Sequence, residues 1–230
     1  MTKIFCDIAD INLIKKFDKK NIVKGFTTNP SLMRKAGAKD YKDYAKKILN
    51  ICKTKPVSLE VFADNNDEML EQALKINSWG KNVFVKIPIT NSKGKSSKNL
   101  IKKLINKKIK LNITAIMTVS QIKHLMSLNF KSECILSIFC GRIADSGVDP
   151  KITIKNVKKL TKNKRNIKLL WASCRELYNI IEAEKTGCDI ITVPNEILKK
   201  MKLFGKNLKS YSLETVKDFY KDAVSAGFKI

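Results

Sequence analysis

Short apolar runs alternate with longer amphipathic segments along the whole chain. The amphipathic segments, such as residues 66–80, 97–108 and 174–187, repeat their apolar residues at helical spacing. The apolar runs have the length of buried strands and occur at residues 3–7, 22–26, 57–62, 82–87, 110–115, 134–139, 167–172 and 188–193. Eight strand–helix repeats in 230 residues predict an α/β protein with the (β/α)8 TIM-barrel fold.

The sequence also weighs against an open sheet and predicts one more element at the end of the chain. A doubly wound sheet also alternates strands and helices, but no G-x-G-x-x-G motif follows any of the candidate strands. Residues 207–228 form one more amphipathic segment, which predicts an extra C-terminal helix. No linker rich in Pro, Gly or Ser divides the chain, so we expect a single domain over residues 1–230.

Side-chain alternation separates an apolar face of each strand from a face that carries polar groups. Lys86 shares a face with Phe84, whereas Val83, Val85 and Ile87 point the opposite way. In a barrel the polar face is the interior, and active sites lie at the C-terminal ends of the strands. The same rule groups polar residues in five more strands: Asp7 with Phe5; Ser58 and Glu60 with Phe62; Asn112 and Thr114; Ser137 with Ile135 and Phe139; and Ser173 and Arg175 with Trp171.

Lys86 stands in the apolar run VFVKIPIT, and two interpretations compete for it. Burying an ammonium is costly unless it is paired or neutralised, and a lysine that loses its proton becomes a nucleophile. Alternatively, a lysine at a strand end can reach water along its flexible stem. Polar residues in matching phase on six strands favour the barrel interior, so we interpret Lys86 as a catalytic nucleophile.

The charge balance indicates which partners the surface attracts. The chain has 46 Lys+Arg against 21 Asp+Glu and a formal net charge of +25, which favours anions such as phosphorylated small molecules, nucleic acid or acidic membranes. The basic residues are spread evenly and aromatic residues make up only 7%, so no stacking platform for nucleic acid is evident. No apolar run has the length of a membrane span. We expect phosphorylated substrates, and neither nucleic acid nor a membrane.

Cysteine and histidine usage limits the redox and metal chemistry. The six cysteines form no C-x-x-C pair, and His124 is the only histidine. We therefore expect free thiols in a reducing cytoplasm, no disulfide framework and no metal site. The opening residues already have a strand pattern and show no signal peptide, which also favours a cytoplasmic protein.

The polar groups of the predicted interior fit Schiff-base chemistry. A neutral lysine attacks a ketone, and the resulting iminium accepts electrons when a carbon–carbon bond breaks. Carboxylates move the protons that this reaction requires. Arg142 and Arg175 suit a phosphate group, because a guanidinium binds oxyanions with two parallel hydrogen bonds.

Seven segments together resemble the transaldolase family, most closely its short transaldolase and fructose-6-phosphate aldolase-like branch. The similarity covers nearly the whole chain, and TTNPS followed by VKIPIT is its most specific part. The matching segments are FCDIAD, GFTTNPSL, LEVFAD, VFVKIPIT, LNITAIMT, SIFCGRIADSG and WASCRE.

The resemblance implies a role for each matching residue. Lys86 would form the Schiff base, and Asp7 would take the proton from the substrate C4 hydroxyl. Glu60 would act through a water held by Thr114. The family uses no metal or organic cofactor. Substrate binding would fall to Asn29 and Asn112 at the dihydroxyacetone hydroxyls, to Ser137, Arg142, Ser173 and Arg175 at the phosphate, and to Thr28 along the same pocket.

Two residues bear on the branch within the family. The aldolase members have Gln and Tyr where this chain has Glu60 and Phe139, so the resemblance implies a transaldolase. An aldolase that releases free dihydroxyacetone is the alternative, and a cationic nucleic-acid-binding barrel is a remote one. The chain departs from the family pattern at Ile8, Ile138, Cys140 and Cys174, and alternation places Ile8, Ile138 and Cys174 away from the pocket. Short family members form pentamers that stack into decamers, which implies a homo-oligomer here.

Overall fold

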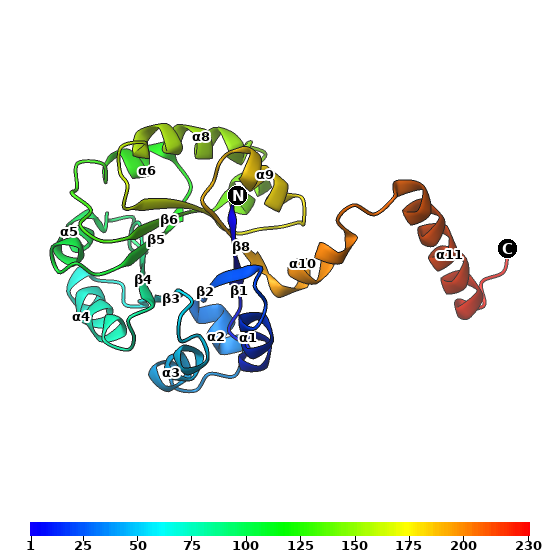
Figure 1. Cartoon of the computed structure of the whole chain (residues 1–230), viewed down its shortest axis with the longest axis horizontal. Helices are drawn as coiled ribbons and strands as arrows, with labels where there is room; N and C mark the ends of the chain where they lie inside the picture. Colours follow the sequence, from blue (N-terminus) through cyan, green and yellow to red (C-terminus); the bar gives the residue numbers. More distant parts are fainter. The chain divides into compact units, whose positions relative to one another are not determined.

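Eight parallel strands close into a barrel in the computed structural model, which describes residues 1–230. Strand β1 pairs with β8, and this contact closes the ring (Figure 1). The predicted TIM barrel is therefore confirmed. The strands are β1 (Lys3–Asp7), β2 (Val23–Thr27), β3 (Val57–Glu60), β4 (Val83–Pro88), β5 (Leu111–Ile116), β6 (Cys134–Ile138), β7 (Ile167–Trp171) and β8 (Ile190–Pro194).

Helices follow the strands and surround the barrel. Asp or Asn side chains cap several of them, and such a cap contributes about 1 kcal/mol; Asn29, for example, accepts from the backbone N–H of Leu32 at 2.9 Å. The helices of this part of the chain are α1 (Ile11–Asp18), α2 (Pro30–Lys35), α3 (Tyr41–Ile51), α4 (Asn66–Asn77), α5 (Lys98–Asn106), α6 (Val119–Lys123), α7 (Cys140–Asp145), α8 (Pro150–Thr161), α9 (Asn179–Lys185) and α10 (Asn195–Lys199).

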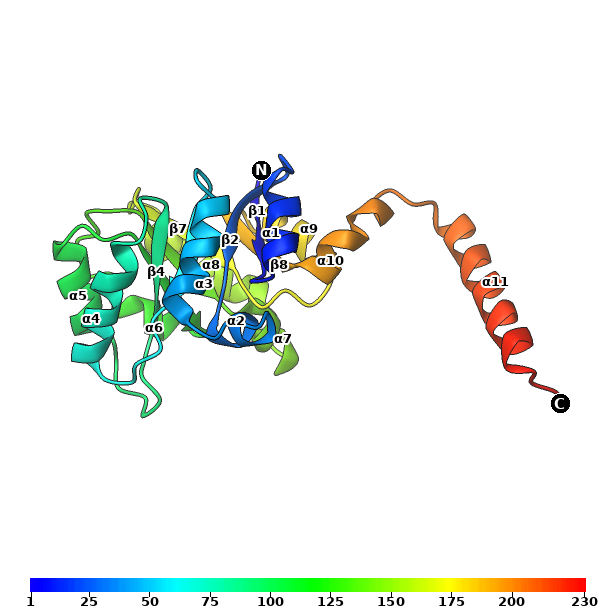
Figure 2. The ribbon, with the colours of Figure 1, turned by 90° about the horizontal axis from the view of Figure 1, so that it is seen from below.

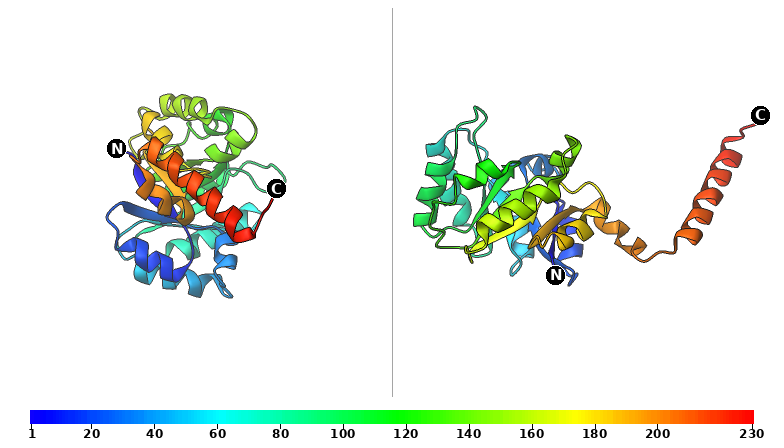
Figure 3. Two further views of the ribbon diagram at one scale, coloured as in Figure 1. Left: turned by 90° about the vertical axis from the view of Figure 1, so that its right-hand side faces the viewer. Right: turned by 90° about the horizontal axis from the view of Figure 1, so that it is seen from above.

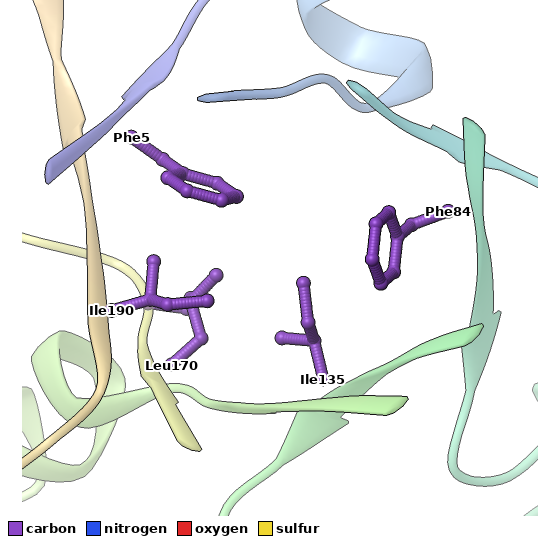
Figure 4. Packing of buried hydrophobic residues seen from close by; sticks show 6 residues of the cluster. Phe5, Phe84, Ile135, Leu170 and Ile190 are labelled. Atoms are coloured by element: carbon purple, nitrogen blue, oxygen red, sulfur yellow. The ribbon is translucent and has the colours of Figure 1, made fainter. Parts of the chain in front are cut away.

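The barrel interior begins with an apolar layer at the N-terminal half of the strands. Phe5, Phe84, Ile135, Leu170 and Ile190 point toward one another there (Figure 4). Strand β2 contributes Gly25 to this layer, where an added Cβ would lie 2.6 Å from the Phe5 ring. The polar residues Asp7, Thr27, Lys86, Ser137 and Thr192 each stand two positions after a member of this layer. The strand period of two therefore places a polar layer above an apolar one.

The structure corrects the predicted phase of β7. Leu170 belongs to the interior cluster and pairs in register with the interior residue Ile190. Trp171, which was predicted to face inward, therefore points to the outer side of the barrel, where it is buried. Beyond it, Ser173 has a φ of 61°, so strand alternation no longer holds for the following residues. Helix α9 starts at Asn179 and not at the predicted residue 174.

Strand β3 is also shorter than predicted. It ends at Glu60, so Phe62 lies outside the strand and its side chain is 60% exposed. Its ring packs edge-on against Tyr41, with 5.2 Å between the centroids. Phe62 is therefore not an interior residue.

The chain divides into two compact units, Met1–Leu198 and Lys199–Ile230. The second unit contains a short 3-10 helix (Lys200–Leu203) and α11 (Leu208–Ala226), which is one continuous helix (Figure 3). The predicted C-terminal helix is confirmed, and the single domain over residues 1–230 stays a prediction. None of the helices combines the length and hydropathy that a membrane-spanning segment needs.

Candidate active site

A cavity of about 220 Å³ opens at the C-terminal ends of the strands. Helices α2 and α7 directly follow β2 and β6, and Figure 2 shows both at the end of the barrel away from the N-terminus. Active sites of TIM barrels lie at this end. The cavity is lined by Asp7, Thr27, Asn29, Lys86, Thr114, Ser137, Phe139, Arg142, Ala172, Ser173, Cys174, Arg175, Thr192 and Pro194.

Lys86 is buried at the floor of this cavity and is only 7% exposed. Its Nζ lies 3.0 Å from Glu60 Oε2 and donates to the carbonyl oxygen of Thr28, also at 3.0 Å. Lys86 and Glu60 are register partners on β4 and β3, so both side chains enter the barrel at the same level. The buried ammonium is thus paired, and a carboxylate stands within reach of its proton.

Tyr41 on α3 binds the backbone of Glu60 at the edge of β3 that faces away from β4. Its hydroxyl donates to the Glu60 carbonyl oxygen and accepts from the Glu60 N–H, both at 2.9 Å. Strand β2 pairs with β3 only at Phe26–Val57 and Thr27–Ser58, so Glu60 has no strand neighbour on that side. The tyrosine hydroxyl takes the place of this neighbour, and burial raises the pKa of Tyr41 well above its usual value.

Asp7 is the second carboxylate of the site. Burial raises its pKa above the usual value; the nearby charge of Lys86 and the hydrogen bond from Thr27 oppose this effect, while the charge of Glu60 adds to it. Thr27 donates to Asp7 Oδ1 at 2.7 Å, and the Thr27 hydroxyl is also hydrogen-bonded to the Thr192 hydroxyl at 2.5 Å. Asp7 therefore combines a raised pKa with access to the cavity, as a general base requires.

Amide and hydroxyl groups connect the neighbouring strands. Asn112, which is fully buried, donates to Ser58 Oγ at 3.0 Å and accepts from Ser137 Oγ at 2.6 Å. The Thr114 hydroxyl is buried at the cavity wall and has no hydrogen-bond partner within the protein. Such a group is available to a water or a substrate hydroxyl.

The mouth of the cavity is the positively charged part of the site. Arg142 lies over the Phe139 ring at 5.7 Å from its centroid. Arg175 Nη2 pairs with Asp145 Oδ2 at 2.5 Å, and both side chains are about half exposed. Gly141 permits α7 to approach β7 closely, because an added Cβ would lie 1.6 Å from the carbonyl oxygen of Ser173. The close approach brings both arginines and Ser173 to one rim.

The structure brings most of the predicted site residues together. Nine line the cavity, and each of the other three is in contact with a lining residue. Glu60 contacts Lys86, and Asn112 contacts Ser137. Thr28 was predicted to line the pocket, but its hydroxyl donates to Ser58 O and only its carbonyl oxygen meets Lys86.

Sequence reasoning missed three polar or sulfur-containing residues of the cavity. Thr27 and Thr192 lie on β2 and β8, the two strands to which the alternation rule was not applied. Counting two positions onward from Gly25 and Ile190 would have found both. Cys174 was predicted to face away, but it lines the cavity because the strand ends before it. Burial raises the pKa of its thiol to about 12, so it is a poor nucleophile.

A larger cavity of about 880 Å³ lies at the opposite end of the barrel. The apolar residues Phe5, Phe84, Ile135 and Ile190 contribute to its lining, and lysines such as Lys3, Lys24 and Lys168 surround it. The lining of this larger cavity includes no buried lysine beside a carboxylate. The smaller cavity is therefore the candidate active site. No group of three or more His, Cys, Asp or Glu side chains is placed to hold a metal ion.

The fold and the site together define a TIM-barrel protein whose interior presents a lysine flanked by two carboxylates. The chain belongs to the Transaldolase/Fructose-6-phosphate aldolase family, whose model matches residues 4–230. It is 36% identical over 200 residues to "Probable transaldolase 2" of Listeria monocytogenes, with 86% of this chain and 88% of that protein covered. A "Probable transaldolase" of Nitrosopumilus maritimus is 35% identical over 201 residues, with 86% of each chain covered.

Solved structures support the fold independently. Dihydrodipicolinate synthase from Rhodopseudomonas palustris superposes with a TM-score of 0.57 at 12% identity, over 98% of this chain and 81% of that chain. Orotidine 5'-monophosphate decarboxylase from Metallosphaera sedula gives a TM-score of 0.55 at 12% identity, over 87% and 92%. At such identities the similarity concerns the barrel fold alone.

Proposed function

We propose that this protein is a Schiff-base transaldolase. It transfers a dihydroxyacetone unit from a ketose phosphate, such as sedoheptulose 7-phosphate or fructose 6-phosphate, to an aldose phosphate. The observation that carries the proposal is the buried Lys86 Nζ at 3.0 Å from Glu60 Oε2, in a cavity that Asp7 also lines. Both the nucleophile and the acid–base groups of the reaction are present there.

The first step is attack by Lys86 on the ketose C2 carbonyl. Glu60 accepts the ammonium proton and leaves a neutral amine, which adds to C2 and forms a carbinolamine. Loss of the C2 oxygen as water gives the iminium, and this step requires a proton donor. Glu60 supplies that proton through a water held by Thr114, whose buried hydroxyl has no partner within the protein.

The second step breaks the C3–C4 bond. Asp7 takes the proton from the C4 hydroxyl, the C4–O bond becomes a carbonyl, and the C3–C4 electron pair moves toward the iminium nitrogen. An aldose phosphate leaves, and an enamine of dihydroxyacetone remains on Lys86. The same steps in reverse add this unit to the acceptor aldehyde, and Asp7 returns its proton to the new hydroxyl.

Amides and cations hold the substrate. Asn29 binds a hydroxyl of the dihydroxyacetone unit, and Asn112 binds another through the amide hydrogen that Ser58 does not take. The Arg175–Asp145 pair is half exposed, so its exchange for a phosphate costs little. The phosphate is bound by Ser137, Arg142, Ser173 and Arg175.

Residues Glu60 and Phe139 favour a transaldolase over an aldolase. A carboxylate next to Lys86 keeps the amino group paired, and Phe139 has no hydroxyl that could protonate the enamine. Protonation would release free dihydroxyacetone, whereas an unprotonated enamine waits for an acceptor. An aldolase that releases dihydroxyacetone is the alternative activity.

Borohydride trapping with fructose 6-phosphate tests the proposal. We expect a three-carbon adduct on Lys86 by peptide mass spectrometry, and one equivalent of glyceraldehyde 3-phosphate per site when no acceptor is added. Lys86→Met should abolish the adduct, whereas Lys110→Met, at the opposite end of the barrel, should retain it. Absence of any adduct on Lys86 with either ketose phosphate would contradict Schiff-base chemistry. Continuous release of dihydroxyacetone would identify the aldolase instead.

The same proposal extends to assembly and location. Helix α11 exposes Leu213, Val216, Tyr220 and Val224 by more than half, which supports a homo-oligomer, a pentamer or decamer, in which a second copy covers this helix. All six cysteines are free and buried, which fits the reducing cytoplasm.

A further inference from the structure

A chain of hydroxyl groups leads to Asp7 from the two strands beside it. Thr192 on β8 is hydrogen-bonded to Thr27 on β2 at 2.5 Å between the Oγ1 atoms, and Thr27 donates to Asp7 Oδ1 at 2.7 Å. β1, which carries Asp7, lies between these two strands. Thr27 is 2% and Thr192 5% exposed, so water competes weakly for either hydroxyl.

The number of hydrogens fixes the direction of this chain while Asp7 is ionised. A carboxylate only accepts, and each threonine hydroxyl has a single hydrogen. Thr27 commits its hydrogen to Asp7, so the bond between the two threonines must be donated by Thr192. The order is therefore Thr192 to Thr27 to Asp7.

This order has two consequences for the carboxylate. Oδ1 already accepts the hydrogen bond from Thr27, so Oδ2 is the freer oxygen to take the proton of a substrate hydroxyl. A hydroxyl that accepts a hydrogen bond also becomes a stronger donor, by about 10 to 30% per bond in condensed-phase estimates. Thr192 thus strengthens the bond from Thr27 without touching Asp7.

We infer that Thr192 is a positioning residue that, through Thr27, orients Asp7 and stabilises its ionised form for proton abstraction. Its kinetic consequence rests on the proposed function, whereas its effect on Asp7 in the free protein does not. The competing explanation is that the two threonines only fill the barrel. Valine has nearly the shape of threonine, so Thr192→Val retains the packing and removes only the hydroxyl.

Titration of the free protein is the first experiment. The Asp7 carboxyl carbon is followed by 13C NMR and assigned by its loss in Asp7→Asn. We expect Thr192→Val to move the Asp7 titration to higher pH, because the hydrogen bond from Thr27 to the ionised carboxylate becomes weaker. Thr192→Ser should titrate like the unsubstituted protein. Thr186→Val is the matched control, since the Thr186 hydroxyl donates to carbonyl oxygens at the end of α9, and it should leave Asp7 unchanged.

Single-turnover kinetics with fructose 6-phosphate is the second experiment. Thr192→Val should slow the release of glyceraldehyde 3-phosphate about three- to tenfold, while the rate of borohydride-trappable adduct formation on Lys86 changes less than twofold; this pattern is expected of a weakened general base. Thr192→Ser should restore the release rate.

The outcomes separate the two proposals. An unchanged Asp7 titration in Thr192→Val overturns the positioning role, whatever the protein catalyses. A shifted titration in a protein that forms no Lys86 adduct retains the hydrogen-bond chain and overturns the transaldolase proposal. If the valine variant does not fold, Thr192→Ala removes the same hydroxyl without adding an atom and is titrated in its place.

Discussion

At the scale of single residues, three ionisable groups carry the chemistry that we propose for this barrel. Lys86 and Glu60 neutralise each other at 3.0 Å, whereas Asp7 has only neutral hydrogen-bond partners, with Lys86 acting on it through space. Its burial therefore penalises the ionised form that the reaction requires. The proposed general base is thus placed where it costs stability, a trade-off that is common in active sites.

Asp7→Asn should lose carbon–carbon cleavage but gain thermal stability at neutral pH. The folded pKa of Asp7 is raised, so the folded protein binds this proton more tightly than the unfolded chain does. Ionised Asp7 destabilises the fold above its raised pKa, and this penalty disappears below the unfolded pKa. The melting temperature of Asp7→Asn should exceed that of the unsubstituted protein by a few degrees at pH 7.

Calorimetry as a function of pH checks this prediction. The difference in melting temperature should shrink as the pH falls toward about 4, where Asp7 becomes protonated in both states. Asp67→Asn is the control, because the Asp67 side chain is 90% exposed, and it should have little effect. A variant that is less stable than the unsubstituted protein at pH 7 would contradict the prediction.

At the scale of secondary-structure elements, one of the two shortest strand pairings of the barrel lies between β2 and β3. These strands pair at only two positions. Beyond them, the backbone N–H and carbonyl oxygen of Glu60 are hydrogen-bonded to the Tyr41 hydroxyl of α3. A helix side chain thus completes the sheet next to the carboxylate that we propose as the proton shuttle. The geometry of Glu60 depends on the docking of α3 as well as on strand pairing.

Tyr41→Phe should lower stability and slow Schiff-base formation together. The loss of the hydroxyl leaves the Glu60 N–H and carbonyl oxygen without their partner, which costs about 1 to 3 kcal/mol for each unsatisfied buried group. The rate of adduct formation on Lys86 should fall about tenfold, because Glu60 is no longer fixed beside it. Urea unfolding and rapid-quench trapping measure the two effects.

Tyr44→Phe is the matched control for this variant. Tyr44 lies one turn further along α3, and its hydroxyl donates to Ala9 O and Ala36 O at 3.1 Å. Its removal should also lower stability but leave the trapping rate within about twofold, since neither partner touches Glu60. Equal effects of both variants on trapping would show that Tyr41 has no specific role.

At the scale of the whole molecule, α11 carries an apolar surface that no other residue of the second unit covers. Leu213, Val216, Tyr220 and Val224 recur every three or four residues and form one stripe along the helix. All four are more than half exposed. An apolar stripe of this kind marks an interaction surface, and in the proposed assembly a second copy of the chain covers it.

Val216→Glu should therefore weaken assembly. A carboxylate in the stripe would be buried by a second copy, and burying an unpaired charge is costly. Sedimentation velocity should show a shift from the oligomer toward the monomer. Thr215→Glu introduces the same charge on the opposite face of α11 and should leave the oligomer intact. A monomeric unsubstituted protein would contradict the proposed assembly.

The order of strands, their inward faces on β1, β3, β4, β5 and β6, and the position of Lys86 among them could all be predicted from local patterns. The period of two in strands and the helical spacing between them act over a few residues, so they are readable along the chain. The prediction failed for β7, where Leu170 and not Trp171 faces the interior, and beyond the strand the Ser173 conformation with a φ of 61° ends the alternation. The prediction of inward faces was incomplete for β2 and β8. Thr27 is the last residue of β2, and Thr192 is the third residue of β8.

The sequence by itself determined a barrel with a lysine and carboxylates at the C-terminal ends of its strands, because burial and alternation are local consequences of residue type. Only the tertiary structure decided which of these groups meet. The contacts of Lys86 with Glu60 and of Thr192 with Thr27 join residues that are 26 and 165 positions apart. Closure of the barrel sets the register between strands and brings β8 beside β1, and distances across the interior follow from that closure.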